Sequence, residues 1–258
     1  MAPAHPKPGR KPRSAESGAR LSERQRLNWL RLIRSENVGP VTFRAFVNQF
    51  GSAQAALTAL PMLSRRGGRT QSIHVCTEAE AEAELEAADR AGARLVAMGE
   101  QGYPPALAQV DAPPPLLYAK GKLELAESPI VAIVGARNGS AVGQKFTHQL
   151  ATELGLEGFV IASGLARGID TAAHLASLER GTITVLAGGI DVVYPPENAE
   201  LQRAIGDRGL LLTERSPGFA PRGKDFPRRN RLISGVSLGR GGRSRRTVRL
   251  FDYRWLCR

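Results

Sequence analysis

The sequence has few aromatic residues, only two cysteines and no long apolar run. Aromatic residues make up 5% of its 258 residues, so large aromatic anchors contribute little to its core. Cys76 and Cys257 lie far apart and do not form a disulfide framework. No apolar run approaches the ~18 residues of a membrane-spanning helix, and the basic start MAPAHPKPGRKPR lacks the apolar segment of a signal peptide. We therefore expect a cytoplasmic protein.

The net charge of +12 is concentrated at the two ends of the chain. Residues 1–20 contain five Lys or Arg and one Glu, and residues 240–258 contain seven Arg and one Asp. The body between them is nearly neutral, so the charge of the whole chain is a weak argument for nucleic acid binding. Residues 1–20 are rich in proline, glycine and basic residues, which is typical of a disordered arm.

Residues 21–75 predict a small helical domain. Ser22 can cap a helix whose apolar face is made by Leu27, Leu30, Leu32 and Ile33. A Gly-Pro turn then leads into a second helix that ends at Gly51. This arrangement resembles helix-hairpin-helix or SAM-like DNA-binding modules, although ordinary helical bundles use the same turn. Residues 76–128 predict a connecting helix capped by Thr77 and a linker that contains PPPLLYAKG.

Residues 129–239 alternate between short apolar runs and amphipathic helices. The runs are IVAIVG (130–135), FVIASG (159–164), TITVLAGG (182–189) and LLLTE (210–214). Continuous apolar strands separated by helices indicate a parallel sheet that is covered on both faces. We therefore predict an α/β fold, a doubly wound Rossmann-like sheet preceded by the small helical domain.

Glycines and cations follow these strands, and ligands of such sheets bind beyond the carboxyl ends of the strands. Five cations are expected to converge on one rim there: Arg137, Arg167, Lys224, Arg229 and Arg231. Ser140 and Thr171 can cap helices whose free N–H groups suit phosphate. The stretch KDFPRRNRLISGVS (224–237) places basic residues where a helix begins, beside the positive end of its dipole, and so predicts a bound polyanion.

The pattern does not fit a dinucleotide or a catalytic site. The first strand-to-helix turn reads GARNG instead of G-x-G-x-x-G, and Ala162-Ser163 stand where a ribose-binding acid is expected. Asp170 and His174 are four residues apart on one helix, which is typical of a surface pair or cap, and Ser163 has no nucleophile elbow. The remaining histidines show no metal-ligand spacing: His5, His74 and His148. We expect no cofactor, no metal and no catalytic residue.

Tyr194 leaves two interpretations open. The segment Tyr194-Pro195-Pro196 is typical of a rigid loop, and the tyrosine ring is also of the kind on which a nucleic acid base stacks.

Four motifs, in this order and spacing, resemble the DprA/Smf family of bacterial DNA-processing proteins: IVAIVGARNGSAVG, VIASGLARGIDTAAH, VLAGGIDVVYPPEN and TERSPGFAPRGKDFPRRNRLISGVSLG. The resemblance covers residues 22–239, including the SAM-like module. It implies a protein of natural transformation that binds incoming single-stranded DNA, shields it from nucleases and helps load RecA. It also implies a homodimer formed through the later part of the Rossmann-like domain, and no catalytic reaction.

The resemblance further implies which residues meet DNA. Gly135 and Arg137 match the family's G-[SA]-R loop, which contacts phosphates. The S-G-x-A-x-G-I-D turn is matched by Ser163, Gly164 and Gly168. The basic F-P-x-R-N-R segment is matched by Lys224, Arg229, Asn230 and Arg231. With Ser140 and Arg167, these residues form the DNA-binding site that we expect.

The sequence departs from the family pattern after Gly239. The family continues with a valine run, whereas residues 240–258 read RGGRSRRTVRLFDYRWLCR. Codons can be chosen for this tail such that dropping one base restores the family pattern, and we interpret the tail as a frameshifted ending. A missing core strand would leave Leu232, Ile233 and Val236 uncovered. We therefore expect the chain to aggregate, to lack the family's dimer and to load RecA weakly.

One alternative class uses the same type of sheet. Nucleotide-derivative binders and phosphoribohydrolases carry P-G-G-x-G-T-x-x-E, where this chain has AGGIDVVYPPE and no Thr-x-x-Glu helix start. Because a fold alone does not fix a function, competition between mononucleotides and oligo-dT is the experiment that separates the two classes.

Overall fold

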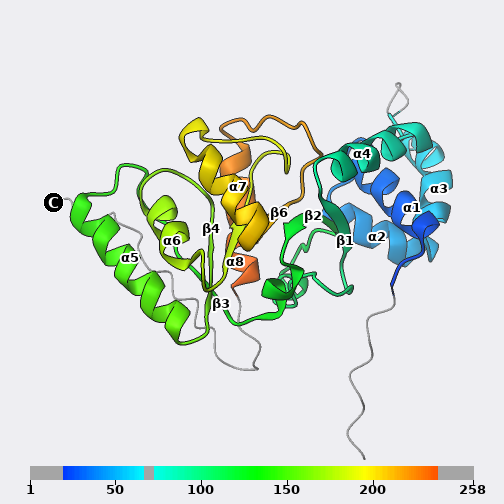
Figure 1. Ribbon diagram of the computed structural model, residues 1–258. Helices are drawn as coiled ribbons and strands as arrows, with labels where there is room; N and C mark the ends of the chain where they lie inside the picture. The colour runs from blue at the N-terminus through cyan, green and yellow to red at the C-terminus, as the bar shows by residue number, and fades with distance from the viewer. Residues whose placement is uncertain (1–19, 67–72, 238–258) are drawn as a thin grey trace, which may run out of the picture.

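The computed structural model describes residues 20–66 and 73–237. In Figure 1 the first four helices gather at one end of the molecule, and a six-stranded sheet with its own helices forms the rest. The tail at residues 240–258 and all but Arg20 of the basic arm expected at residues 1–20 lie outside the described residues.

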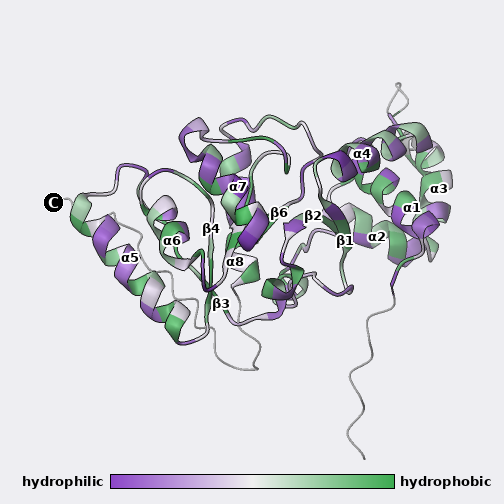
Figure 2. Ribbon diagram, in the orientation of Figure 1, coloured by the Kyte–Doolittle hydropathy of each residue, from purple (hydrophilic) through white to green (hydrophobic). Residues whose placement is uncertain are grey.

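The helical module consists of α1 (Glu23–Arg34), α2 (Pro40–Phe50), α3 (Ala53–Arg66) and α4 (Glu78–Arg90). α1 and α4 each begin with a capping box, in which the hydroxyl of Ser22 or Thr77 accepts a backbone N–H three residues later and the side chain there accepts the cap's own N–H. Leu27, Leu30 and Leu32 are buried. The predicted caps and the apolar face of the first helix are confirmed. In Figure 2 α4 is mostly hydrophilic, whereas α2 and α3 carry more hydrophobic residues.

The sheet has the strand order β1-β2-β6-β5-β4-β3. Its strands are β1 (Arg94–Ala97), β2 (Leu116–Gly121), β3 (Ile130–Ala132), β4 (Val160–Ser163), β5 (Thr182–Val185) and β6 (Leu210–Thr213). β3 to β6 run parallel, while β2 pairs antiparallel with both β6 and β1. Every residue of β4, β5 and β6 is buried, as expected for parallel strands with both faces covered.

Helices cover both faces of the sheet. They are α5 (Ala141–Leu156), α6 (Ile169–Ser177), α7 (Ala199–Arg208) and α8 (Asp225–Val236), with short 3-10 turns at η1 (Leu107–Gln109), η2 (Leu123–Glu127) and η3 (Pro196–Asn198). Successive side chains of a strand point toward opposite faces of the sheet. Ile161 of β4 packs with α5 and α6, whereas its neighbour Ala162 packs in the same cluster as Leu232 and Val236 of α8. The predicted α/β, Rossmann-like fold class is confirmed.

Two expectations about this part of the chain need correction. Leu232, Ile233 and Val236 are only 1%, 2% and 2% exposed, so the expectation that they would be left uncovered is wrong. Their helix packs on β3, β4 and β5 and on η1, which together bury its apolar side. The segment 76–128, expected as a helix and a linker, also contributes β1 and β2 to the sheet. The run of prolines directly before Leu116 is typical of a linker, which is why β2 did not stand out in the sequence.

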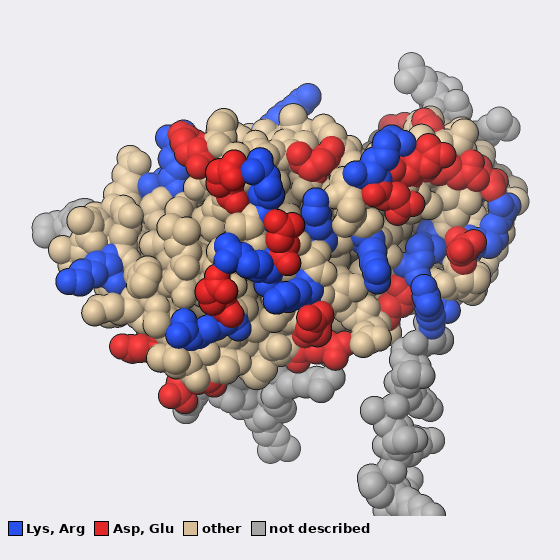
Figure 3. Space-filling model, viewed as in Figure 1, with Lys and Arg blue, Asp and Glu red and all other residues tan. Residues whose placement is uncertain are grey.

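Within the described part of the chain, every helix is too short or too polar to cross a lipid bilayer. Figure 3 shows acidic side chains gathered over α4, while basic and acidic side chains are interspersed over the sheet domain on this face.

Candidate nucleic-acid interface

Four loops meet at one edge of the sheet because β3, β4, β5 and β6 are parallel and end on the same side. They are residues 133–139, 164–168, 186–195 and 214–224, each leading into a helix or a 3-10 turn. The candidate interface has a buried layer of side chains that fastens these loops together and an exposed layer that faces solvent.

Asp170 is the centre of the buried layer. Its carboxylate, on a residue only 4% exposed, accepts backbone N–H groups from three positions on two loops: Gly135 at 3.3 Å, Gly164 at 3.1 Å and Ala166 at 3.3 Å. Burial raises the pKa of Asp170, and the charge of Arg229 together with these three N–H donors opposes that rise. This carboxylate therefore holds the loops after β3 and β4 in register.

Arg229 enters the buried layer from the first half of α8. Its Nη1 donates to the carbonyl oxygens of Gly164 at 2.7 Å and Val185 at 2.5 Å. Gly164 directly follows β4, and Val185 is the last residue of β5. Burial lowers the pKa of Arg229 to about 10, so the group stays protonated near neutral pH. A Cβ on Gly164 would lie 2.6 Å from the guanidinium carbon, so any other residue at this position requires the Arg229 side chain to shift.

His174 is also enclosed rather than part of a surface pair. It is 0% exposed and lies between the hydroxyl oxygens of Thr182, 2.7 Å from Nδ1, and Thr184, 3.0 Å from Nε2. Burial lowers the pKa of His174 to about 3, so the ring is neutral at physiological pH. The expectation that Asp170 and His174 form a surface pair or cap is therefore wrong, because α6 turns both of them toward the sheet.

Several residues expected to touch DNA directly are used inside the protein. Ser163 is 0% exposed, and its hydroxyl donates to the carbonyl of Ile133 at 2.6 Å. Gly168 has φ +73, and a Cβ on it would lie 2.5 Å from the carbonyl oxygen of Ala136. Burial removes the side chains of Ser163 and Arg229 from direct contact with a phosphate, so we correct those two roles to positioning of the loops.

Arg231, Ser140 and Thr171 also have roles within the chain. Arg231 forms an ion pair with Glu214 and donates to the carbonyl of Ala112 at 2.8 Å, on the side of the sheet domain nearest the helical module. Ser140 caps α5, as predicted, by accepting from Gly143 N–H at 3.1 Å. Thr171 does not cap a helix, since α6 begins at Ile169 and the threonine hydroxyl donates to the carbonyl of Ala166.

The exposed layer combines cations with two aromatic rings. The guanidinium of Arg137 lies 5.4 Å from the ring centroid of Phe226, and the Phe226 and Tyr194 rings are 5.0 Å apart. Tyr194 is 45% exposed. Lys224 and Asn230 are exposed on α8 and its N-cap. Arg167 is exposed too, but it forms an ion pair with Glu197 at 2.6 Å.

Phe226 is the member of this layer that the sequence reasoning missed. A signal was present, because an aromatic residue beside a basic segment is a common element of single-strand binding. No group of His, Cys, Asp and Glu residues able to hold a metal ion occurs within residues 20–66 and 73–237.

Two family models match the chain. A model described as DNA recombination-mediator protein A matches residues 94–240. A model described as the DprA-like N-terminal HHH domain matches residues 23–87. Together they cover both the sheet domain and the helical module.

Curated relatives agree with these models. Protein Smf of Synechocystis sp. is 32% identical over 235 residues, which cover 84% of this chain and 58% of the relative. DNA processing protein DprA of Streptococcus pneumoniae is 46% identical over 139 residues, which cover 53% of this chain and 49% of the relative. The chain spans about half the length of the curated relatives it matches.

Solved structures show the same similarity. The X-ray structure of DNA processing protein A from Streptococcus pneumoniae superposes with a TM-score of 0.60 at 34% identity, over 75% of this chain and 69% of that one. A structure that concerns the single-stranded DNA binding mode of DNA processing protein A from Helicobacter pylori has a TM-score of 0.52 at 33% identity, over 57% of this chain and 66% of that one. Since the first family model alone matches more than half of its residues, this chain belongs to the DNA recombination-mediator protein A family, the DprA/Smf proteins.

Proposed function

We propose that this chain binds single-stranded DNA along the carboxyl ends of β3 to β6, and that it acts in natural transformation by protecting the incoming strand and presenting it to RecA. The observation that carries the proposal is the exposed layer, in which Arg137 lies over the Phe226 ring of the aromatic pair and Lys224 is exposed at the N-cap of the helix that carries Phe226. Similarity to a relative whose structure concerns single-stranded DNA binding supports the same assignment.

The exposed layer favours a single strand over a duplex. Cations such as Arg137 and Lys224 suit phosphates, which both forms of DNA offer. An exposed ring such as that of Tyr194 gains most from stacking on a base, and only a single strand leaves base faces free. Because phosphate contacts and stacking carry little sequence information, we expect binding that does not depend on base sequence.

We propose that the chain is a binding protein without catalytic turnover, acting in the cytoplasm. The three residues of catalytic type near the site are occupied by structural bonds. The hydroxyl of Ser163 donates to a carbonyl, Asp170 accepts three N–H groups, and both nitrogens of His174 meet threonine hydroxyls. None of them is poised as a nucleophile with its base.

The test is a titration of oligo-dT at several salt concentrations, with mononucleotides as competitors. We expect Arg137→Ala to weaken binding and to reduce the slope of log affinity against log salt by about 0.7, the value for one phosphate contact on a single strand. Arg203→Ala, which removes an exposed arginine from α7, is the control and should change neither quantity. Preference for duplex, or equal competition by a mononucleotide, would contradict the proposal and favour the nucleotide-binding alternative.

A further inference from the structure

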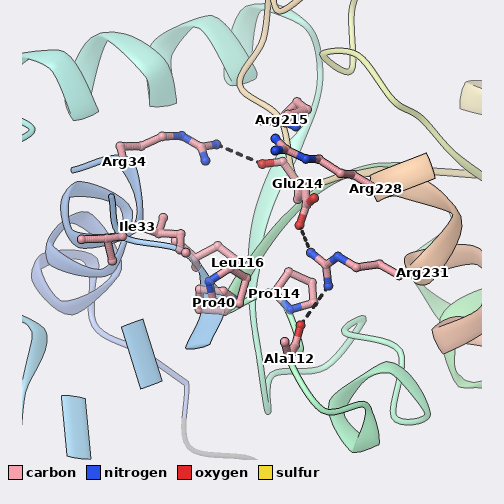
Figure 4. A pocket seen from close by; sticks show the side chains of 13 residues that line it. Ile33, Arg34, Pro40, Ala112, Pro114, Leu116, Glu214, Arg215, Arg228 and Arg231 are labelled. Atoms are coloured by element: carbon pink, nitrogen blue, oxygen red, sulfur yellow. Dashed lines mark hydrogen bonds and ion pairs between the residues drawn. The ribbon is translucent and has the colours of Figure 1, made fainter. Parts of the chain in front are cut away.

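A cavity of about 480 Å³ lies between the helical module and the sheet domain (Figure 4). The end of α1 and the start of α2 form one wall, and the wall opposite comes from the loop before β2, the end of β6 and α8. Apolar side chains from both parts contribute to it, among them Ile33, Pro40, Pro114 and Leu116. We call this cavity the interdomain groove.

The charged lining of the interdomain groove is predominantly cationic. Four arginines line it, together with a single carboxylate: Arg34, Arg215, Arg228, Arg231 and Glu214. Figure 4 shows Glu214 between the arginines, paired with Arg231 and accepting from Arg34 through its backbone carbonyl at 3.3 Å. The groove therefore presents more positive than negative charge to a molecule inside it.

The carboxylates that balance two of these arginines lie outside the groove lining. Arg34 pairs with Glu84 at 2.8 Å, and Arg215 pairs with Asp225 at 2.6 Å. Arg228 is exposed and makes no ion pair with any residue in the described ranges. An anion that enters the groove would meet Arg228 without having to displace another partner.

The interdomain groove and the exposed layer both include residues of the first turn of α8. Phe226, which touches Arg137 and Tyr194, and Arg228, which lines the groove, are two residues apart in the first turn of this helix. At about 100° of rotation and 1.5 Å of rise per residue, their side chains leave the helix on opposite sides, while their backbone positions differ by only about 3 Å along its axis. A strand that passes from the aromatic pair to the groove therefore has to cross the start of α8, where the N-cap residue Lys224 is exposed.

We propose that the interdomain groove holds the continuation of the bound single strand, with a base against the apolar side chains and its phosphate at Arg228. This inference rests on the proposed function. An apolar surface beside a few placed cations suits a nucleotide unit, which has a flat apolar face and an anionic phosphate. The start of α2, whose N-cap Gly39 lines the groove without a side-chain cap, adds partial positive charge of the helix dipole.

Gly39 offers a test that separates charge from folding. Its φ of −98 is open to any residue, and a Cβ on it would meet nothing within 4 Å. Gly39→Asp and Gly39→Asn both supply a good N-cap for α2, so the two variants should fold equally well. Only the aspartate adds negative charge to the groove, and it should weaken strand binding where the asparagine does not.

The experiment compares oligothymidylates of about 4 and about 16 nucleotides, the limits of the site sizes of common single-strand-binding domains. We expect Gly39→Asp and Arg228→Ala to weaken binding of the long strand by roughly threefold to fivefold and to leave the short strand unaffected. Gly39→Asn and Arg203→Ala should match the unsubstituted chain with both strands. Thermal melting of each variant checks that the fold is retained.

The outcomes separate the groove from the exposed layer. If Arg137→Ala weakens binding while Gly39→Asp behaves like Gly39→Asn, the proposed function stands and the groove inference is wrong. Thymidine monophosphate and unlabelled oligothymidylate are compared as competitors at equal concentration of nucleotide. If the two displace the long strand equally well, the groove is a mononucleotide site and the inference is also wrong. If the unsubstituted chain binds no single strand at all, the proposed function fails and the groove inference fails with it.

Discussion

The buried and exposed layers of the interface come from the same sequence motifs but use charge differently. In RRNR, Arg229 turns inward to the carbonyls at the ends of β4 and β5, while its neighbour Arg228 stays in solvent. In SGLARGID, Asp170 is enclosed by N–H donors, while Arg167 remains on the surface. A motif that looks like one ligand-binding unit therefore holds two sets of residues, one that shapes the loops and one that lies on the surface.

The largest expected effect separates Arg229 from Arg228. Arg229→Met leaves the buried carboxylate of Asp170 without its opposing charge and two strand-end carbonyls without their donor. The free energy of unfolding should fall by roughly 3–5 kcal/mol. Arg228→Ala, at an exposed position, should change it by less than about 0.5 kcal/mol. Urea unfolding measures both, and equal stability of the two variants would remove the distinction between the layers.

A pH titration tests the buried layer next. Since burial lowers the pKa of His174 to about 3, below its ordinary 6.5, the unfolded chain binds a proton in this range and the folded chain does not. The contribution of His174 to the free energy of unfolding is therefore fully present above about pH 6.5. It decreases as the pH falls, by about 2 kcal/mol between pH 7 and pH 5. The raised pKa of Asp170 acts in the opposite direction, so the measurement is a difference between variants.

His174→Asn should remove this part of the pH dependence, whatever it does to stability at neutral pH. His148→Gln, at an exposed position on α5, is the control and should keep the slope of the unsubstituted chain. An unchanged slope in His174→Asn would mean that the pKa of the ring does not differ between the folded and the unfolded chain.

The aromatic pair gives the third test, now of the exposed layer. Tyr194→Ala should weaken oligo-dT binding by about 1 kcal/mol, the low end for stacking on one base, because its ring already packs on Phe226. Its thermal melting temperature should change little, since the ring is 45% exposed. An abasic strand provides the control: if Tyr194→Ala weakens binding of that strand equally, the ring does not stack on bases.

The smallest effect concerns the ion pair between Arg167 and Glu197. Both side chains are more than half exposed, so the pair contributes little to stability. Glu197→Gln frees the guanidinium for a phosphate and should strengthen strand binding by no more than about fivefold, the equivalent of a surface ion pair. Glu200→Gln, which frees Arg203 on α7, is the matched control. A gain in both variants would indicate a general effect of net charge.

Much of the fold could be predicted from the sequence because its signals are local. The caps at Ser22 and Thr77 and the apolar runs of β4 to β6 depend on residues close in the chain. β1 and β2 could not be placed, since the pairing of β2 with β6, and of β1 with β2, is decided by contacts between residues distant in the chain. The sequence also could not show that the Arg229 side chain points into the protein, because the carbonyls that accept from it belong to residues 44 and 65 positions earlier in the chain.

The contact between Gly164 and Arg229 has a consequence for how relatives are recognised. With a Cβ only 2.6 Å from the guanidinium carbon, an alanine at position 164 fits only if the side chain at position 229 shifts or is shorter, so we expect the two positions to vary together among homologues. A search that uses these motifs then selects proteins for the buried residues that hold the loops after the strands. Some of the proteins that it finds can have lost Arg137 and Lys224, and with them affinity for DNA, while keeping the buried residues of the same motifs.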